Sequence, residues 1–129
     1  MTGCWEEVSK DMDEEKELRA VLRIRLYREK KFYGPGIHQL LQLTGELGSL
    51  SAACQQMGMS YSKGRRIIGD MEQALGAAVL ETGQGGRAGG YSRLTPQAKE
   101  MMARYGAFLE EAEAAVQELF RKHFQTETV

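Results

Sequence analysis

The stretch that decides the fold runs from residue 48 to residue 75, GSLSAACQQMGMSYSKGRRIIGDMEQAL. Its first part is a short run of good helix formers, which Ser49 or Ser51 can cap. Gly58 follows at a position where a helix end favours a left-handed residue, and Ser60 can cap a second helix that continues to the end of the stretch. Two helices separated by a break of about three residues are typical of a helix-turn-helix.

The second helix of this stretch has an apolar side and a polar side. Apolar and small residues recur at helical spacing and predict the side that packs into a core: Gly64, Ile67, Ile68, Met71 and Leu75. The opposite side carries cations, a hydroxyl group, an amide and a glycine that permits close approach: Ser62, Lys63, Arg65, Arg66, Gly69 and Gln73. Lys and Arg bind phosphates, a forked Arg pairs with a guanine edge and Gln pairs with adenine, so this side suits the major groove of DNA. A solvated basic face on an ordinary core helix is the alternative interpretation.

A glycine-rich hairpin is predicted after this helix. Residues 77–81 and 91–94 indicate two strands around residues 82–90, and five of the eight residues from Gly83 to Gly90 are glycine. Such a tip is costly to order, so we interpret it as a flexible wing that orders on contact with phosphates. We expect DNA contacts from six residues at the start of the second helix and from two arginines of the wing: Ser60, Tyr61, Ser62, Lys63, Arg65, Arg66, Arg87 and Arg93.

Two further elements are predicted before the helix-turn-helix. Apolar and other residues alternate from Leu18 to Tyr27, which indicates a half-buried strand with an arginine-rich outer side. That side could contact DNA or pair with acids on another element, and we favour the pairing. After the break at residues 34–36, a helical stripe runs from Ile37 to Leu47 and predicts a helix that backs the helix-turn-helix.

The last element predicted is a long helix. Thr95-Pro96 is a helix start, with Thr as the cap and Pro at the first position, and the apolar pattern continues to about Phe124. A helix of about 29 residues spans roughly 43 Å, which is more than a small domain core covers. We therefore expect its distal half to bury its apolar stripe against a second copy of the chain, giving a homodimer. The early strand or the acidic arm could cover part of the stripe instead.

The net charge of −1 conceals an uneven distribution of charge. Residues 18–34 include six basic residues and one acidic residue, and residues 60–104 include seven basic and four acidic residues. Both ends are acidic, with seven acids and two bases in residues 1–17 and five acids and two bases in residues 105–129. Because salt screens charges beyond about 8–10 Å, local potential rather than net charge governs the attraction of phosphates.

Length and composition exclude several classes of protein. The 129 residues fit one domain, and 42% hydrophobic with 27% charged residues is ordinary for a soluble protein. No apolar run approaches the ~20 residues of a membrane span, and the acidic start is not signal-like. Cys4 and Cys54 lack a metal-ligand spacing, and no nucleophile stands at a known spacing from a base. We therefore expect a cytoplasmic protein that is not an enzyme, has no cofactor or metal, and does not associate with membranes.

Several of these motifs together resemble the DNA-binding domain of the ModE family, molybdate-responsive bacterial transcription regulators whose winged helix is related to that of LysR-type regulators. The similarity covers roughly Pro35 to Tyr105, and it is carried by Gly48-Ser-Leu-Ser-Ala-Ala, Met57-Gly-Met-Ser-Tyr-Ser, Glu72, Leu75-Gly76, the glycine-rich stretch and Leu94-Thr95. The best-known members carry molybdate-binding domains after the DNA-binding domain, whereas this sequence ends at Val129. The resemblance thus implies DNA binding without an effector domain of its own, and it does not imply molybdate sensing.

The sequence therefore predicts a mainly α fold with a small β component, a winged helix-turn-helix with a long C-terminal dimerisation helix. The expected organisation is an acidic N-terminal arm at 1–17, the winged helix-turn-helix domain at 18–94 and the dimerisation helix at 95–129. The predicted function is sequence-specific binding of double-stranded DNA by a homodimeric transcriptional regulator whose effector is unknown. The alternative is a winged-helix protein–protein interaction module that does not bind DNA.

Overall fold

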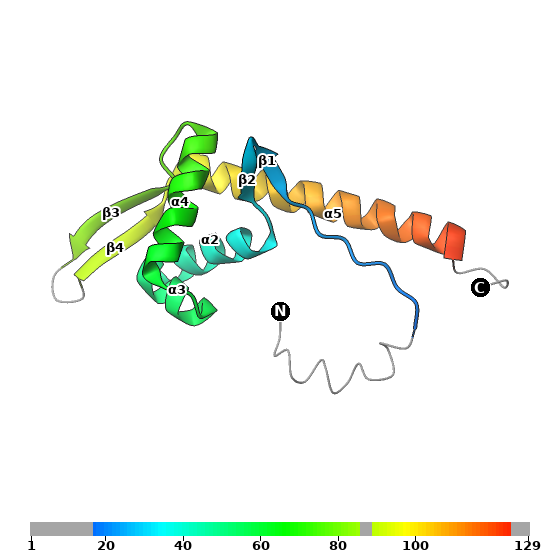
Figure 1. Ribbon diagram of the computed structural model, residues 1–129, viewed down its shortest axis with the longest axis horizontal. Coiled ribbons are helices and arrows are strands. Elements are labelled where there is room, and N and C mark those ends of the chain that lie inside the picture. Colours follow the sequence, from blue (N-terminus) through cyan, green and yellow to red (C-terminus); the bar gives the residue numbers. More distant parts are fainter. Residues whose placement is uncertain (1–16, 86–88, 125–129) are drawn as a thin grey trace. The chain divides into compact units, whose positions relative to one another are not determined.

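The computed structural model of the protein describes residues 17–85 and 89–124 (Figure 1). The fold is mainly helical, with two small antiparallel sheets and a long C-terminal helix, and is compatible with the predicted winged helix-turn-helix. Contacts divide the chain into two compact units, of which the larger is Arg23–Glu111. The predicted acidic arm lies outside the described residues, apart from Glu17.

Three helices form the centre of the larger unit and occupy the places predicted for them. They are α2 (Pro35–Leu47), α3 (Leu50–Met57) and α4 (Tyr61–Leu75). The predicted core face of α4 is confirmed by the burial of Gly64, Ile68 and Met71, while Ile67 and Leu75 are half-buried. The helix-turn-helix is therefore built around the apolar side that the sequence pattern defines.

Local capping signals set the ends of α3 and α4 as predicted. Ser49 is the cap of α3, since its hydroxyl oxygen accepts a hydrogen bond from the Ala52 N–H at 3.1 Å. Ser60 caps α4 in the same way by accepting from the Lys63 N–H at 3.1 Å. Between them Gly58 has a φ of 72°, a left-handed conformation that ends α3 and turns the chain into α4.

Small side chains bring α3 and α4 into close contact. Gly64 and Cys54 are both buried, and a Cβ atom on Gly64 would overlap the sulfur of Cys54. Burial also raises the pKa of the Cys54 thiol, which therefore stays neutral and serves as a small apolar residue. Glycine at position 64 is thus required by the distance between the two helices.

Before α2 the chain forms a short hairpin instead of the predicted long strand. β1 (Leu26–Arg28) pairs antiparallel with β2 (Lys30–Tyr33), and Glu29 at the tip has a positive φ of 69°. The strand predicted over residues 18–27 is therefore wrong for residues 18–25. Only the last two residues of the predicted strand, Leu26 and Tyr27, belong to β1, and the chain reverses just after the predicted stretch.

The alternation that suggested the long strand is still visible in the burial. Ile24 and Leu26 are half-buried, whereas Arg23 and Arg25 are exposed. Alternation requires only an extended chain with one side against the protein, but a strand also needs partners for its N–H and C=O groups, which the pattern does not specify. Neither arginine forms an ion pair with another described residue, so the expected pairing with acids is not seen there.

The hairpin predicted as a wing is regular over most of its length. β3 (Leu80–Gly85) pairs antiparallel with β4 (Gly89–Leu94), and the register continues to Gly85 opposite Gly89. The strands therefore extend further towards the tip than the predicted bounds of 77–81 and 91–94, and residues 77–79 lie before β3, while the flexibility of the tip stays a prediction. Each glycine has the backbone N–H and C=O groups that a strand ladder needs. Glycine-rich strands can therefore pair once the apolar ends of the hairpin fix the register.

The long helix α5 (Pro96–Phe124) begins at the predicted Thr95-Pro96 signal. Thr95 is buried, and its hydroxyl accepts a hydrogen bond from the Ala98 N–H at 3.2 Å while donating to the Ala78 carbonyl at 2.7 Å. The same side chain thus caps α5 and ties its start to the entrance of β3.

Aromatic side chains join β2, α2 and α5 in the core of the larger unit. The rings of Tyr33 and Tyr105 are both buried and meet edge to face, with centroids 4.8 Å apart. Burial, and after it the proximity of Tyr105, raises the pKa of Tyr33, and burial lowers the pKa of His38. The protonated Tyr33 hydroxyl and Nδ1 of a neutral His38 share a hydrogen bond of 2.6 Å. His38 therefore has a structural role in this aromatic cluster.

The smaller unit is described by residues 17–22 and 112–124. Gln117 Nε2 donates a hydrogen bond to the Ala20 carbonyl at 3.1 Å, and the rings of Phe120 and Phe124 stack with centroids 5.5 Å apart. None of the helices within 17–85 and 89–124 combines the length and apolar character needed to cross a bilayer.

Candidate nucleic-acid interface

The start of α4 gathers six of the eight predicted DNA-binding residues on one exposed surface. All six are exposed, and they follow one another in the cap and the first turns of the helix: Ser60, Tyr61, Ser62, Lys63, Arg65 and Arg66. Tyr61 is 51% exposed although it is a large aromatic residue. Further along α4, Gly69 and Gln73 are exposed as well, which keeps the outward side of the helix free of bulky side chains. We call this outward side of α4 the recognition face.

The recognition face is flanked by a different hairpin on each side (Figure 1). Tyr61 and Glu72 lie on the side of β3 and β4, where the Glu72 carboxylate accepts a hydrogen bond from the Val79 N–H at 2.9 Å. Lys63 and Asp70 lie on the side of β1 and β2, where Asp70 pairs with Lys30 at 3.0 Å. Side chains of α4 therefore connect the helix to both hairpins without covering the outward face.

A cleft of about 580 Å³ separates the start of α4 from the β3–β4 hairpin. Hydroxyl groups are prominent in its lining, which includes Ser49, Ser51, Tyr61, Tyr91 and Ser92. Hydroxyl groups and free N–H groups at helix starts are common donors to DNA phosphates. The sequence pattern predicts the two early serines only as caps and does not single out Tyr91 and Ser92, because their position beside α4 depends on how the hairpin docks.

The docking of this hairpin is fixed by Ser92. Its N–H donates to the Gly48 carbonyl at 2.9 Å, and its hydroxyl accepts from the Leu50 N–H at 3.2 Å. The neighbouring residue Tyr91 pairs with Gly83 of β3, and its ring covers this glycine, where a Cβ atom would lie 2.5 Å from the ring. Strand β4 is thereby attached to the turn between α2 and α3, and the hairpin leaves the helix-turn-helix at a defined place.

The two arginines predicted in the wing have different outcomes. Arg87 lies outside the described residues. Arg93 is exposed on β4, with its guanidinium carbon 5.1 Å from the centre of the Tyr91 ring, and it lines a groove with Gly45 and Lys99. The structure thus places Arg93 at the base of the hairpin, apart from the six residues of the recognition face.

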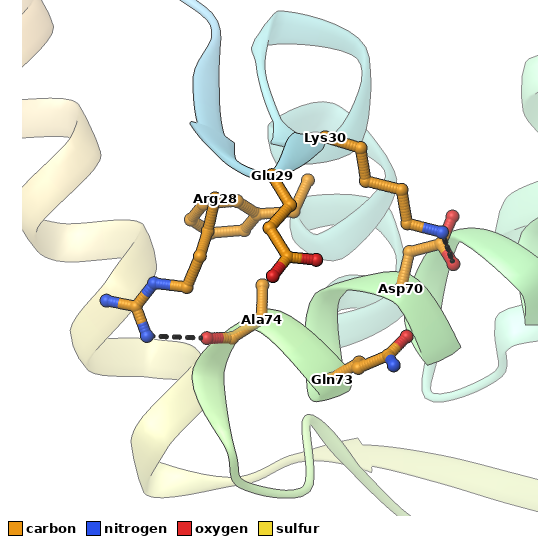
Figure 2. A pocket seen from close by; sticks show the side chains of 7 residues that line it. Arg28, Glu29, Lys30, Asp70, Gln73 and Ala74 are labelled. Carbon is orange, nitrogen blue, oxygen red and sulfur yellow. Dashed lines mark hydrogen bonds and ion pairs between the residues drawn. The ribbon is translucent and has the colours of Figure 1, made fainter.

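The β1–β2 hairpin contacts the C-terminal half of α4 through polar side chains. Figure 2 shows Arg28, Glu29 and Lys30 directed towards the helix across a pocket of about 460 Å³. The Arg28 guanidinium donates to the Ala74 carbonyl at 3.0 Å, close to the helix end where a cation is favoured, and Lys30 pairs with Asp70. These contacts join the β1–β2 hairpin to α4, and no local sequence signal predicts them.

The described residues contain no cluster of three His, Cys, Asp or Glu side chains arranged to hold a metal ion. The exposed functional groups at the start of α4 are hydroxyls, guanidinium groups and an ammonium group. Such groups bind phosphates and base edges. The arrangement therefore supplies binding chemistry for a polyanion on a rigid helix.

No protein-family model matches the chain. Among curated proteins, the chain is similar to the molybdenum-pterin-binding protein MopB of Rhodobacter capsulatus, with 40% identity over 68 residues that make up 53% of this chain and 25% of that protein. It is 31% identical over 87 residues to the molybdenum transport protein ModE of Herbaspirillum seropedicae, covering 67% of this chain and 29% of that protein. The molybdenum-pterin-binding protein MopA of Rhodobacter capsulatus is 26% identical over 68 residues.

The chain thus spans between a quarter and a third of the length of the curated relatives it matches. These relatives include a ModE, the family that the sequence motifs resemble. The chain is therefore homologous to a group of proteins that comprises ModE and the molybdenum-pterin-binding proteins MopA and MopB.

Proposed function

We propose that the protein is a homodimeric transcriptional regulator that binds double-stranded DNA in a sequence-specific manner through a winged helix-turn-helix. In this proposal α4 is the recognition helix and the β3–β4 hairpin is the wing. The protein acts by binding and carries out no chemical reaction. The relatives' names associate them with molybdenum, and we include a molybdenum-related regulated process in the proposal.

The observation that carries the proposal is the exposed start of α4. Two arginines, a lysine and three hydroxyl groups project from a helix whose other side is buried against α3. An α-helix fits the major groove of B-DNA, in which forked Arg side chains discriminate guanine, and a Gly such as Gly69 permits close approach of the backbone. An ordinary surface helix has no need to leave a tyrosine such as Tyr61 half exposed beside this cationic group.

Dimerisation is supported by the apolar residues of α5 that remain exposed in a single chain. Phe108 is 52% exposed, Leu119 is 53% exposed and Phe124 is 50% exposed. Burial of large side chains of this kind contributes about 1.5–3 kcal/mol each, which favours a second copy as the covering surface. Two recognition helices related by a twofold axis address half-sites one or two helical turns apart.

Selection of bound duplexes from a random pool by the purified protein tests this function directly. We expect a palindromic consensus whose half-sites are about 10–10.5 bp apart, or a multiple of that spacing. On the selected site Arg66→Ala should weaken binding by about tenfold or more, because a bidentate base contact contributes about 1–3 kcal/mol of discrimination. The effect on random duplex should be smaller, and Arg121→Ala, which removes an equal charge near the end of α5, should change neither affinity appreciably.

The result that overturns the proposal is an absence of duplex binding at low salt, where phosphate contacts are strongest. In that case the exposed face of α4 would belong to a protein–protein interaction module. Equal losses of affinity for selected and random duplex in Arg66→Ala would reduce Arg66 to a phosphate contact. Sedimentation analysis tests the dimer, since a mass of one chain at micromolar concentration contradicts it and Leu119→Glu should shift a dimer towards that mass.

A further inference from the structure

A second cationic groove lies on the side of α4 that faces the β1–β2 hairpin. It has a volume of about 350 Å³ and is lined by four cationic side chains from three parts of the larger unit: Arg23, Arg25, Lys31 and Lys63. On α4 the lining residues Lys63, Ile67 and Asp70 are spaced by four and three, so they share one side of the helix, and Met59 lies just before the helix cap. The groove therefore runs along the flank of the recognition face.

The positive charge of this groove is not neutralised by neighbouring acids within the described part of the chain. Asp70 is the single acid in the lining, and it is already paired with Lys30 at 3.0 Å. The ion pairs among residues 17–85 and 89–124 are this one and Glu100–Arg104, so none of the four cations is paired there. Four like charges gathered around one groove repel one another, and an anion placed among them relieves that repulsion.

The start of α2 contributes to the same potential. Gly36 and Ile37, in its first turn, line the groove, and this turn has neither a side-chain cap nor an acidic residue. Free N–H groups at a helix start carry partial positive charge. The helix start thus adds to a site that the four cations define.

We propose that this groove binds a backbone phosphodiester of the same duplex whose major groove receives α4. This inference rests on the proposed function and extends it to a second contact region. Lys63 belongs both to the groove and to the exposed start of α4, so a strand that reaches one also reaches the other. The wing lies on the opposite flank, and the recognition face is then held by phosphate contacts on both sides.

The exposure of the groove favours a polyanion over a small free ion. All four cations are exposed to solvent, and a hydrated surface charge binds an isolated phosphate weakly. DNA releases a counterion for each phosphate that is neutralised, so several weak contacts add to a high affinity. A phosphate contact carries no sequence information, and its loss should weaken specific and random duplexes alike.

The first test removes two charges while keeping most of each side-chain stem. Arg23→Gln/Arg25→Gln should make the dependence of log K on log salt less steep by about 1–2 for each bound chain, and by about twice that for a dimer, since each phosphate contributes about 0.9 to the slope. The change should be the same on selected and random duplexes. The control Arg121→Gln/Lys122→Gln removes the same charge from the last turn of α5 and, with sedimentation showing that it keeps the mass of the unmodified protein, should leave the slope unchanged.

The second test separates DNA binding from folding at Gly36. A Cβ at this position meets no atom within 4 Å, and both Gly36→Ala and Gly36→Glu should raise the melting temperature by roughly 2–6 °C because they remove a helical glycine. Only Gly36→Glu places a negative charge at the groove, and we expect it to weaken duplex binding at least fivefold. Gln42→Glu, an exposed position on α2 outside the groove lining, should weaken binding less than twofold.

The outcomes distinguish failure of this inference from failure of the proposed function. If the unmodified protein binds no duplex, the proposed function and the phosphate site fall together. If it binds and the arginine double variant keeps the slope of its control, the groove takes no part and the inference alone is overturned. Binding of inorganic phosphate below about 1 mM without DNA, detected by NMR shifts of groove residues and lost in the double variant, would assign the groove to a free ion and overturn the DNA assignment.

Discussion

Helix α3 and the β1–β2 hairpin, which both contact α4 within the larger unit, differ in how they hold it. Helix α3 meets α4 through buried small residues, with Cys54 against Gly64 and no space for another methyl group. The β1–β2 hairpin meets α4 through exposed polar contacts, chiefly Lys30 to Asp70 and Arg28 to the Ala74 carbonyl. The α3–α4 contact therefore depends on exact volume, and the hairpin contact depends on charges that water screens.

This difference bears on the function that each contact can serve. Helices α3 and α4 are closely packed, so the position of α3 determines the orientation of the recognition face. Screened polar contacts contribute little free energy, so the attachment of the hairpin to α4 is weak, although the buried Tyr33 anchors β2 in the core. The groove with Arg23 and Arg25 lies on this weakly attached side, which suits the proposed second contact with a duplex.

The largest effect expected concerns the α3–α4 contact. Gly64→Ala should lower the free energy of unfolding by about 1–3 kcal/mol, because the added methyl group collides with the Cys54 sulfur in a closely packed site. Urea unfolding at a fixed protein concentration measures the change.

A double-mutant cycle makes this first prediction specific. Cys54→Ala removes the sulfur, and the remaining Cys54 Cβ is 3.9 Å from the position of a Cβ on residue 64, an ordinary contact distance. Gly64→Ala should therefore cost much less when it is made in the Cys54→Ala background. An equal cost in both backgrounds would show that the destabilisation has another origin, such as a change in the path of α4.

The same contrast explains how much of the structure the sequence could predict. The ends of α3 and α4 follow from Ser49, Gly58 and Ser60, whose effects act within four residues, and these predictions are confirmed. The start of α5 at Thr95 was predicted for the same reason. Each of these signals is local, so neighbouring sequence is sufficient to interpret it.

The features that were missed depend on contacts between distant segments. The turn at Glu29 follows directly after the alternating stretch, and nothing local marks it, because the residue at its tip is neither glycine nor asparagine. The basic groove joins residues 23–25 to Lys63, and the hydroxyl-lined cleft joins Ser49 to Tyr91. The residues expected to contact DNA on α4 are adjacent in sequence and were found together, whereas sites assembled across the fold required the structure.

The second prediction concerns the tip of the hairpin. Glu29 has a φ of 69°, which an L-amino acid adopts at a cost of about 1–2 kcal/mol, whereas glycine adopts it freely. Glu29→Gly should therefore stabilise the protein by roughly 0.5–1 kcal/mol after the entropy of the glycine is subtracted. Lys31→Gly, made in the same hairpin at a residue with ordinary φ, should destabilise instead. Destabilisation by both substitutions would mean that the Glu29 side chain has a role that outweighs the backbone strain.

The smallest effect is expected at the ion pair that joins the hairpin to α4. Lys30 and Asp70 have side chains that are 62% and 34% exposed, so a cycle of Lys30→Ala and Asp70→Ala should give a coupling free energy of about 0.2–0.5 kcal/mol that decreases with salt. Glu100 and Arg104, an exposed pair within α5, supply the matched control and should give a similar value. A coupling free energy above about 1 kcal/mol for Lys30–Asp70, with a small value for the control pair, would contradict the weak attachment of the hairpin. The ion pair would then form cooperatively with the docking of the β1–β2 hairpin on α4. Adjustment of the basic groove to DNA would in that case require rupture of the contact, and the hairpin would behave as a fixed wall of the interface.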